Sequence, residues 1–350
     1  MANEHLKLNK IDNMGDSTLT PLLGDNIIEF FDWAFLDRGG FFNIKIPTSG
    51  HYGGDKHKLR LVDDPRYTKG QVWEGFRSNW VWQSGLSCTQ QPNTMTVLRR
   101  NPSAPASTRS LPGVSGVFVG NVFQPTSGVG SYQHHIDYPR GRVIFDSAIS
   151  TSSEVKAEYS YKEINVVRAN SDFFREIQYD TLDGAEGFNF AGSGSYSQLA
   201  GNRLQLPAVA VEVLSGRDLD PYALGGQHYI NTDVLFHVLA EDDYSRDQLL
   251  DIISLQDEKS IYLFDSDRIG RSGVFPLDYR GSTTSTDKDG NFVNSLMYPT
   301  LVDSSGNGGY RYGGIQEGML TFKNAKVQKS DSFGPNLYHG VVRLTTEVIN

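Results

Sequence analysis

The feature that most constrains the fold is residues 117–165, a succession of short strand-like segments separated by turns. Its clearest part is residues 155–161, where apolar and polar side chains alternate: Val155, Ala157, Tyr159 and Tyr161 against Lys156, Glu158 and Ser160. A period of two is typical of an antiparallel strand with one buried face. The preceding residues predict a strand through Val117, Val119 and Val122, further extended segments at 132–138 and 142–145, and turns at 126–130 and 139–141.

Composition favours the same kind of fold. The chain has 350 residues, including 36 glycines, and 11% of them are aromatic, a mixture that suits short strands joined by many turns. A chain of this length usually forms more than one unit. We expect an α+β, β-rich protein with an antiparallel β-sandwich or barrel-like N-terminal unit and an α+β C-terminal domain. The expected division is an arm and apolar helix at 1–50, a β-rich domain at 51–182, a glycine-rich bridge at 183–201 and the α+β domain at 202–350.

An apolar helix is expected after a polar N-terminal arm of residues 1–20. Asp25 is its predicted N-cap, and Gly39-Gly40 is its predicted end. Residues 27–35 hold seven apolar side chains in nine positions, more than one amphipathic stripe requires. The helix is therefore either buried on most sides within its own chain or docked against a neighbouring chain.

The second half predicts one helix laid on an antiparallel sheet. Strands are expected at 208–214, 232–239, 260–264, 319–327 and 338–348. The helix is predicted to begin with Ser245 as N-cap and Gln248 as its capping-box partner. Its predicted apolar face consists of Leu249, Leu250, Ile252, Ile253 and Leu255. Asp289-Gly290 is a hairpin turn signal.

Charge and cysteine content argue against several classes of protein. The net charge of −9 disfavours a general binder of nucleic acids or acidic membranes, because phosphate binding requires a basic surface. The single cysteine, Cys88, cannot form an internal disulfide. Residues 1–16 lack the apolar core of a signal peptide, and no run approaches the roughly 20 apolar residues of a membrane span. We expect synthesis in a reducing cytoplasm and no membrane partner.

Each candidate chemical site lacks part of its motif. His134, His135 and Asp137 are metal-ligand types, but neighbouring residues of a strand point to opposite faces. Residues 287–291 resemble the start of a calcium loop, yet the loop's end ligands would fall on Ser285 and Leu296. The glycines at 192–194 and 306–309 lack phosphate-cradle spacing, and residues 113–116 are one residue short of a nucleophile elbow. We predict no catalytic residue, no cofactor-binding residue and no metal ligand.

Carboxylates and tryptophans leave a remoter alternative open, a carbohydrate-binding or hydrolytic β protein. Asp63-Asp64 or Asp242-Asp243 could supply the paired acids of a glycosidase, although solvated acidic turns explain them better. Trp73, Trp80 and Trp82 could form a sugar-stacking platform, although core packing or a subunit contact is the commoner role. The surrounding residues 72–83 predict a strand pair or an extended segment.

Three parts of the sequence resemble structural proteins of tailed bacteriophages. Residues 136–146 (IDYPRGRVIFD), followed by 155–161 (VKAEYSY), are similar to a strand–turn–strand pattern of phage virion proteins. Residues 70–74 (GQVWE) and 80–82 (WVW) have a similar character. Stretches between residues 207 and 253 resemble the neck and tail-terminator proteins (head–tail connectors), which place a small α+β domain in a ring at the head–tail junction.

The resemblance implies a non-enzymatic subunit of a homo-oligomeric ring, of six or twelve copies, around the DNA channel of the virion. It implies connector, sheath or tube proteins as neighbours, passive contact with DNA, and assembly in the host cytoplasm into the virion neck or tail. An acidic surface would let DNA pass without binding. The alternative within the same particle is a baseplate, fibre-attachment or capsid-decoration protein.

Overall fold

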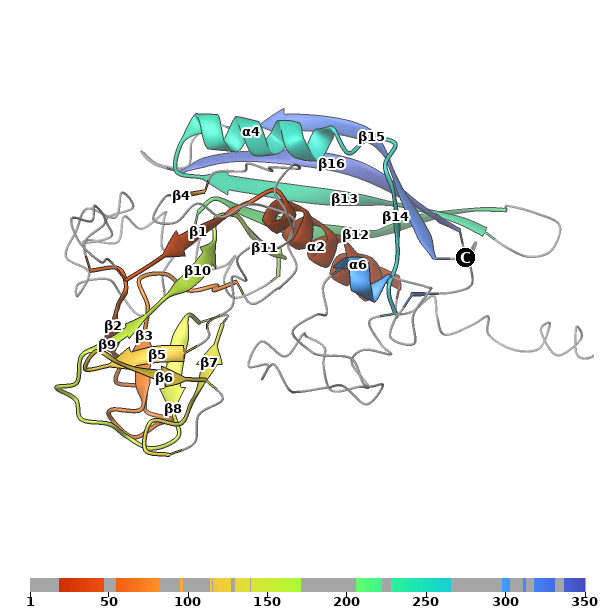
Figure 1. Cartoon of the computed structure of the whole chain (residues 1–350). Coiled ribbons are helices and arrows are strands. Elements are labelled where there is room, and N and C mark those ends of the chain that lie inside the picture. The colour runs from red at the N-terminus through yellow and green to blue at the C-terminus, as the bar shows by residue number, and fades with distance from the viewer. Residues whose placement is uncertain are drawn as a thin grey trace, which may run out of the picture.

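The structure, a computed structural model, describes residues 19–46, 55–81, 95–96, 114, 116–126, 130–138, 140–170, 206–221, 228–265, 298–302, 311–312, 318–330 and 337–349. It contains a six-stranded sheet with its helices and a smaller unit of a seven-stranded and a three-stranded sheet (Figure 1). The sheets are curled and largely antiparallel, so the expected α+β, β-rich class is confirmed.

The six-stranded sheet contains the long strands of the chain. Its order is β11 (Asn165–Arg168), β12 (Ala208–Pro221), β13 (His228–Ala240), β16 (Tyr338–Ile349), β15 (Met319–Lys329) and β14 (Ser260–Tyr262). Neighbouring strands are antiparallel except β11 and β12, which are parallel. The strands predicted for the second half are present, and β12 and β13 are longer than predicted because they continue to pair beyond a bulge between Val213 and Arg217.

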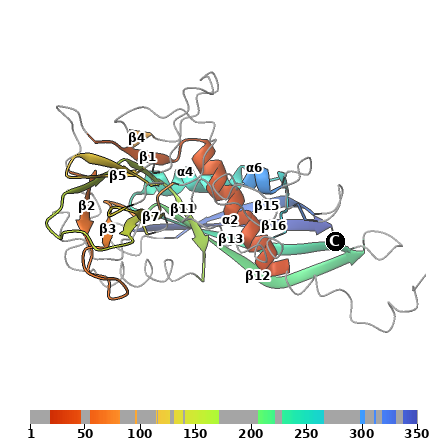
Figure 2. The same cartoon turned by 60° about the horizontal axis from the view of Figure 1, so that its bottom comes forward.

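Both long helices lie on one face of this sheet, here called the inner face. α2 (Leu19–Asp37) packs on β11 and β12, and α4 (Asp243–Ser254) packs on β13, β15 and β16 (Figures 1 and 2). The Phe31 ring contacts that of Phe236 with centroids 5.1 Å apart, and Leu250 leaves no room for a side chain at Gly340. Phe236 and Gly340 point to the same face, because Phe236 pairs with Val342 and Gly340 lies two residues from it.

The start of α2 differs from the prediction. The helix begins at Leu19, so Asp25 lies inside it, and its carboxylate pairs with Arg168 of β11 instead of capping. Pro21 is compatible with this start, because first-turn N–H groups have no helical acceptor. The predicted end is confirmed. Gly39 has φ 90°, its N–H donates to the Leu36 carbonyl, and the Gly40 N–H donates to Phe35, which together form a Schellman motif.

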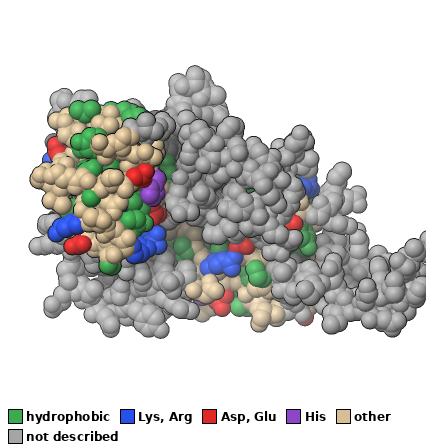
Figure 3. All heavy atoms as spheres, turned by 90° about the horizontal axis from the view of Figure 1, so that it is seen from below, with side chains coloured by type: hydrophobic (Ala, Val, Ile, Leu, Met, Phe, Trp, Pro, Cys, Tyr) green, Lys and Arg blue, Asp and Glu red, His purple; other side chains and the backbone are tan. Residues whose placement is uncertain are grey.

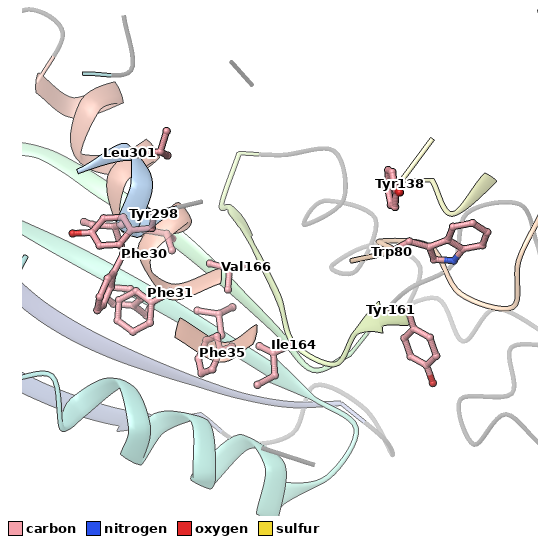
Figure 4. Packing of buried hydrophobic residues seen from close by; sticks show 14 of the residues in the cluster. Phe30, Phe31, Phe35, Trp80, Tyr138, Tyr161, Ile164, Val166, Tyr298 and Leu301 are labelled. Carbon is pink, nitrogen blue, oxygen red and sulfur yellow. The ribbon is translucent and has the colours of Figure 1, made fainter. Parts of the chain in front are cut away.

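Burial of α2 within its own chain is also confirmed, and it decides between the two alternatives for this helix. Leu23, Ile27, Phe31 and Phe35 enter the main core, and Leu36 is buried in a separate cluster with Phe41 and Val81. On its other side, Phe30 and Trp33 contact Tyr298 of the short helix α6 (Tyr298–Leu301), with ring centroids 5.2 and 5.9 Å apart (Figure 4). The many apolar side chains of α2 therefore make their contacts within the chain, with the sheet and with α6.

The start and the apolar face of α4 need correction. Asp242, not Ser245, is the N-cap, because its carboxylate accepts the Ser245 N–H at 2.7 Å. Leu249, Leu250 and Ile253 are buried as predicted, and Ile252 packs against them. Leu255 is 78% exposed. It follows Leu249 by six positions, about 240° around the helix axis, and so points away from the sheet.

The smaller unit is built from short strands. The seven-stranded sheet has the order β6 (Val122–Pro125), β5 (Gly116–Val119), β9 (Val155–Ala157), β2 (Lys58–Leu61), β3 (Val72–Glu74), β8 (Arg142–Phe145) and β7 (His134–Asp137). The three-stranded sheet has the order β10 (Tyr159–Lys162), β1 (Phe41–Ile44) and β4 (Met95–Thr96). The single strand predicted at 155–161 is thus two strands in different sheets, divided at Glu158. Burial alternates in β9, whereas all of β10 is buried, because Ser160 and Lys162 find partners in Asn43 and Asp32.

Two further predictions in this unit are corrected. The strand expected through Val117, Val119 and Val122 turns back at Gly120 and Asn121, whose φ values of 55° and 69° fit a type I′ hairpin. In the described part of residues 72–83, β3 ends at Glu74, and Trp80 makes a single bridge to Tyr161. Only part of this segment is therefore a strand. The rest follows an irregular path that places Trp80 in the core.

The larger unit draws on both halves of the chain. α2 and β11 precede the predicted bridge at 183–201, yet both pack with β12. That bridge, residues 1–18 of the predicted arm and the hairpin signal Asp289-Gly290 lie outside the described residues. Among the helices that the structure describes, none combines the length and apolar character needed to cross a membrane.

Two glycines with similar backbones provide a matched test of the smaller unit. A Cβ on Gly120 (φ 55°) would meet open space, whereas a Cβ on Gly141 (φ 62°) would lie 2.4 Å from the Arg77 carbonyl oxygen. Gly120→Ala should lower the free energy of unfolding by about 1 kcal/mol, the cost of the left-handed conformation alone. Gly141→Ala should lower it by about 3 kcal/mol, because overpacking is added. Urea denaturation measures both, and equal losses would contradict the close packing at Gly141.

Candidate functional site

The tryptophans considered for sugar stacking lie in the core. Trp73 and Trp80 are 3% and 0% exposed, and their indole N–H groups donate to the carbonyls of Gly70 and Arg77 at 3.0 and 2.7 Å. The Trp80 ring also stacks on Tyr159 with centroids 4.2 Å apart. Figure 4 shows Trp80 near Tyr138 and Tyr161. Neither residue is available to a ligand, and Trp82 lies outside the described residues.

The two adjacent histidines of β7 have different environments. His134 is buried, with Nδ1 2.8 Å from the Tyr132 carbonyl oxygen and its ring against Phe145. His135 is on the opposite face, 3.7 Å from Asp146, while Asp137 pairs with Arg140 at 3.0 Å. Within the described part of the chain, no group of three or more His, Cys, Asp and Glu side chains could hold a metal ion. Cys88 and residues 192–194, 287–291 and 306–309 lie outside that part.

The paired acids have structural partners. Asp64 receives two hydrogen bonds from the Arg66 guanidinium and one from Arg142, and these partners hold the pKa of its carboxyl well below the ordinary range. Its neighbour Asp63 is exposed. Asp242 caps α4. Each described pair thus contains one acid with a structural role, and Asp64 in particular does not hold a proton that it could donate near neutral pH.

A buried network of arginines and acids connects β2, β3 and β8. Glu74 is 2% exposed, with Oε2 3.6 Å from Arg60 Nη2 and 3.5 Å from Arg142 Nη2. Arg142 Nη1 reaches Asp64 at 3.2 Å. Buried charges persist only when they are paired, so the network favours one pairing of these strands. Sequence reasoning misses it because its members are distant in the chain. The local signal is a charged residue, Glu74, inside a buried strand.

A second buried cluster lies where α2 meets β10. Lys162 Nζ contacts Asp32 Oδ2 at 2.6 Å, and both side chains are almost fully buried. Glu29 lies three residues before Asp32, on the same side of α2. Burial and then the charge of Asp32 raise the pKa of Glu29 to about 8, although Lys162 acts in the opposite direction. Glu29 therefore keeps its proton at neutral pH.

The solvent side of α4 is acidic and carries two exposed apolar side chains. Residues 241–259 hold seven acids and two bases, a net charge of −5. Tyr244 and Leu255 are 74% and 78% exposed, and Asp251 is exposed between them on the same side of the helix. Exposed apolar groups in such a row are typical of an interaction surface when they are rimmed by polar residues. We call this the α4 surface, defined by Tyr244, Asp251 and Leu255.

The face of the six-stranded sheet away from the helices, here called the outer face, is polar along much of its length and carries a small buried apolar cluster of Ala208, Ala210, Leu239 and Leu337 at one end. Its residues alternate with the buried ones, as in β16, where Val341, Arg343, Thr345 and Glu347 are less buried than their neighbours. Arg343 pairs with Asp233, and Lys323 Nζ lies 2.8 Å from Glu347 Oε2. Lys326 adds a further basic group beside Arg343. On the face of the molecule seen in Figure 3, the described acidic and basic side chains are interspersed.

The half-buried Glu29 of α2 predicts a specific dependence of stability on pH. The pKa of Glu29 is above its unfolded value of 4.5, so its contribution is fully present below pH 4.5 and is lost as pH rises through about 8. Between these values the unfolding constant should rise by up to tenfold per pH unit. Glu29→Gln should remove this component, measured by urea denaturation from pH 5 to 9. The protonated state of Glu29 would be contradicted if the difference in free energy of unfolding between the wild type and Glu29→Gln stayed constant from pH 5 to 9.

The described residues thus offer two unlike surfaces on the larger unit and two buried ionic clusters that join distant segments. The α4 surface carries exposed apolar groups within acidic surroundings, and the outer face carries basic side chains that are in part paired with acids. No protein-family model matches the chain, and no curated protein matches it either.

Proposed function

We propose that this chain is a non-enzymatic structural subunit of a tailed-phage particle that joins copies of itself into a ring at the neck or tail terminator. The observation that carries the proposal is the presence of two unlike surfaces on opposite sides of one sheet. The α4 surface is acidic around Tyr244 and Leu255. The outer face carries Lys323, Lys326 and Arg343.

Two unlike surfaces permit head-to-tail contacts. A contact between different patches of identical subunits generates a closed ring when the rotation between subunits closes. The acidic residues around α4 can pair with basic groups of the outer face such as Lys326, although Arg343 and Lys323 also pair with Asp233 and Glu347 on that face, and such pairing favours one orientation of contact. Ring formation through the α4 surface would bury Tyr244 and Leu255, and large buried side chains of this kind often dominate the binding energy.

The order of elements in the larger unit supports the neck or tail-terminator proposal. In chain order, α2, strands β11 to β13, α4, β14, the short helix α6 and the strand pair β15–β16 form helices packed on one six-stranded sheet. This agrees with the small α+β ring domain that the sequence resemblance implies. The net charge of −9 suits a ring through which DNA passes without binding. Connector, sheath or tube proteins would then contact the rims of this ring.

Self-association of the purified chain tests the proposal. Native mass spectrometry and negative-stain imaging should detect a ring of six or twelve copies. Leu255→Asp should weaken self-association by about tenfold or more, because it places a charge at the apolar centre of the contact. Phe123→Ser is the matched control, since Phe123 is exposed on β6 of the other unit and should leave association unchanged.

Charge reversal tests the head-to-tail arrangement. Asp251→Lys and Lys326→Glu should each weaken the ring, because each places like charges against one another, and the double variant should recover part of the loss. A chain that stays monomeric at all concentrations and in the presence of connector proteins would refute the ring. A ring that is insensitive to Leu255→Asp would refute this choice of surface.

A further inference from the structure

Two histidines and a glutamate form a connected group across three strands of the outer face. Glu212 lies on β12, His237 on β13 and His339 on β16. His237 Nε2 lies 3.0 Å from Glu212 Oε2, and His237 Nδ1 lies 3.4 Å from His339 Nε2. The two imidazole rings are nearly parallel, with an interplanar angle of 7° and centroids 5.7 Å apart. Both nitrogens of His237 are thus directed at titratable neighbours.

The hydrogen-bond chemistry fixes where the protons lie. A carboxylate can only accept, so His237 Nε2 carries a proton and donates it to Glu212. In neutral His237 the Nδ1 atom is then an acceptor, and His339 Nε2–H can donate to it. When His237 takes up a proton on Nδ1, this nitrogen becomes a donor. His339 must then move its own proton to Nδ1 to present a lone pair, because two N–H groups cannot face each other.

Other charged groups lie near both histidines. Glu241 lies two residues beyond Leu239, the partner of His339, and Arg343 lies two residues beyond Val341, the partner of His237. Arg343 pairs with Asp233, and Lys326 of β15 is its cross-strand partner. β11 contributes the apolar Val167, opposite Ala210. The helices lie on the other face. Glu212 contacts His237 directly, so its carboxylate responds to a proton on that ring.

An apolar cluster lies next to the histidines. Ala210 is the cross-strand partner of His237, and Leu239 is the partner of His339. Both belong to a small buried cluster with Ala208 and Leu337, which is separate from the main core. Separation of β13 from β16 at this end of the sheet would expose that cluster to solvent.

We propose that Glu212, His237 and His339 form a proton-operated latch on β12, β13 and β16. One added proton is held between the histidines and strengthens the link to Glu212. A second added proton places two imidazolium groups against each other, and their repulsion separates the start of β16 from β13. The apolar cluster of Ala210 and Leu239 is then exposed, so that mild acid changes the surface that this sheet presents. The latch does not depend on the ring proposed above.

The electrostatics agree with this sequence of events. Burial, and then the charge of His237, lower the pKa of His339 to about 4. A lowered pKa gives a contribution to stability that is present above the unfolded value of 6.5 and is lost as pH falls towards 4. The unfolding constant should rise by up to tenfold for each pH unit in that window through this group.

Imidazole NMR tests the proton positions directly. In the wild-type chain, long-range proton–nitrogen correlation spectra should show the protonated nitrogen of His339 changing as pH falls, before this ring becomes doubly protonated near pH 4. In His237→Gln, the titration of His339 should move upward, because the neighbouring charge is gone. A His339 ring that keeps one tautomer throughout, or a midpoint that His237→Gln leaves unchanged, would overturn the latch.

Hydrogen exchange tests the opening. After correction for the intrinsic effect of pH, the amides of residues 337–341 should lose protection by more than about tenfold between pH 6 and 4, relative to those of residues 342–348. His339→Gln should abolish this local loss, and His135→Gln, which removes an exposed histidine of the other unit, should leave it intact. Two results would contradict the separation of β16 from β13, even if NMR shows that the two imidazole rings influence each other. One is a loss of protection that is uniform along β16, and the other is an equal loss in the wild type and in His339→Gln.

Discussion

Coverage of the inner face of the six-stranded sheet is the constraint on which the rest of the structure depends. Phe236, Phe322, Val342 and Leu344 are fully buried there beneath α2 and α4, and burial of each such side chain contributes about 1.5–3 kcal/mol. α2 comes from the start of the chain and β11 from its middle, yet both pack with β12. Most of the described residues between 41 and 164 therefore belong to the smaller unit, which is inserted between α2 and β11. Strands β1 and β10, which pair with each other, form the two ends of that insertion.

Ion pairs with at least one buried partner mark the places where distant segments meet. Lys162 and Asp32 join β10 to α2, Arg168 and Asp25 join β11 to α2, and Glu74 joins β3 to β2 and β8. A buried ion pair adds little net stability, because desolvation offsets the attraction between the charges. Breaking one leaves a charge without compensation, which is costly. These pairs therefore favour one arrangement of segments over others whose apolar burial would be similar.

The two sides of the larger unit have different chemistry because both long helices pack on the same face of the sheet. Helices can pack only on the apolar side, so the polar residues of β12, β13, β15 and β16 share the other side. This places Glu212, His237 and His339 next to one another on adjacent strands, although 102 positions separate the two histidines in sequence. It also sets the acidic α4 surface and the basic groups of the outer face in opposite directions, the arrangement on which the proposed head-to-tail contact rests.

The sequence by itself determined the features that depend on neighbours along the chain. The alternation in β9, the glycine end of α2, the long strands of the second half and the apolar character of both helices are local patterns, and they are readable because side-chain period and backbone strain act over a few residues. Tertiary contacts decided the rest. Glu158 divides one predicted strand between two sheets, Asp25 pairs with Arg168 instead of capping a helix, and Leu255 faces solvent although its neighbours Leu249 and Ile253 are buried. The histidine group and the buried ionic clusters are outcomes of strand order and register, and these follow from how the whole sheet is covered.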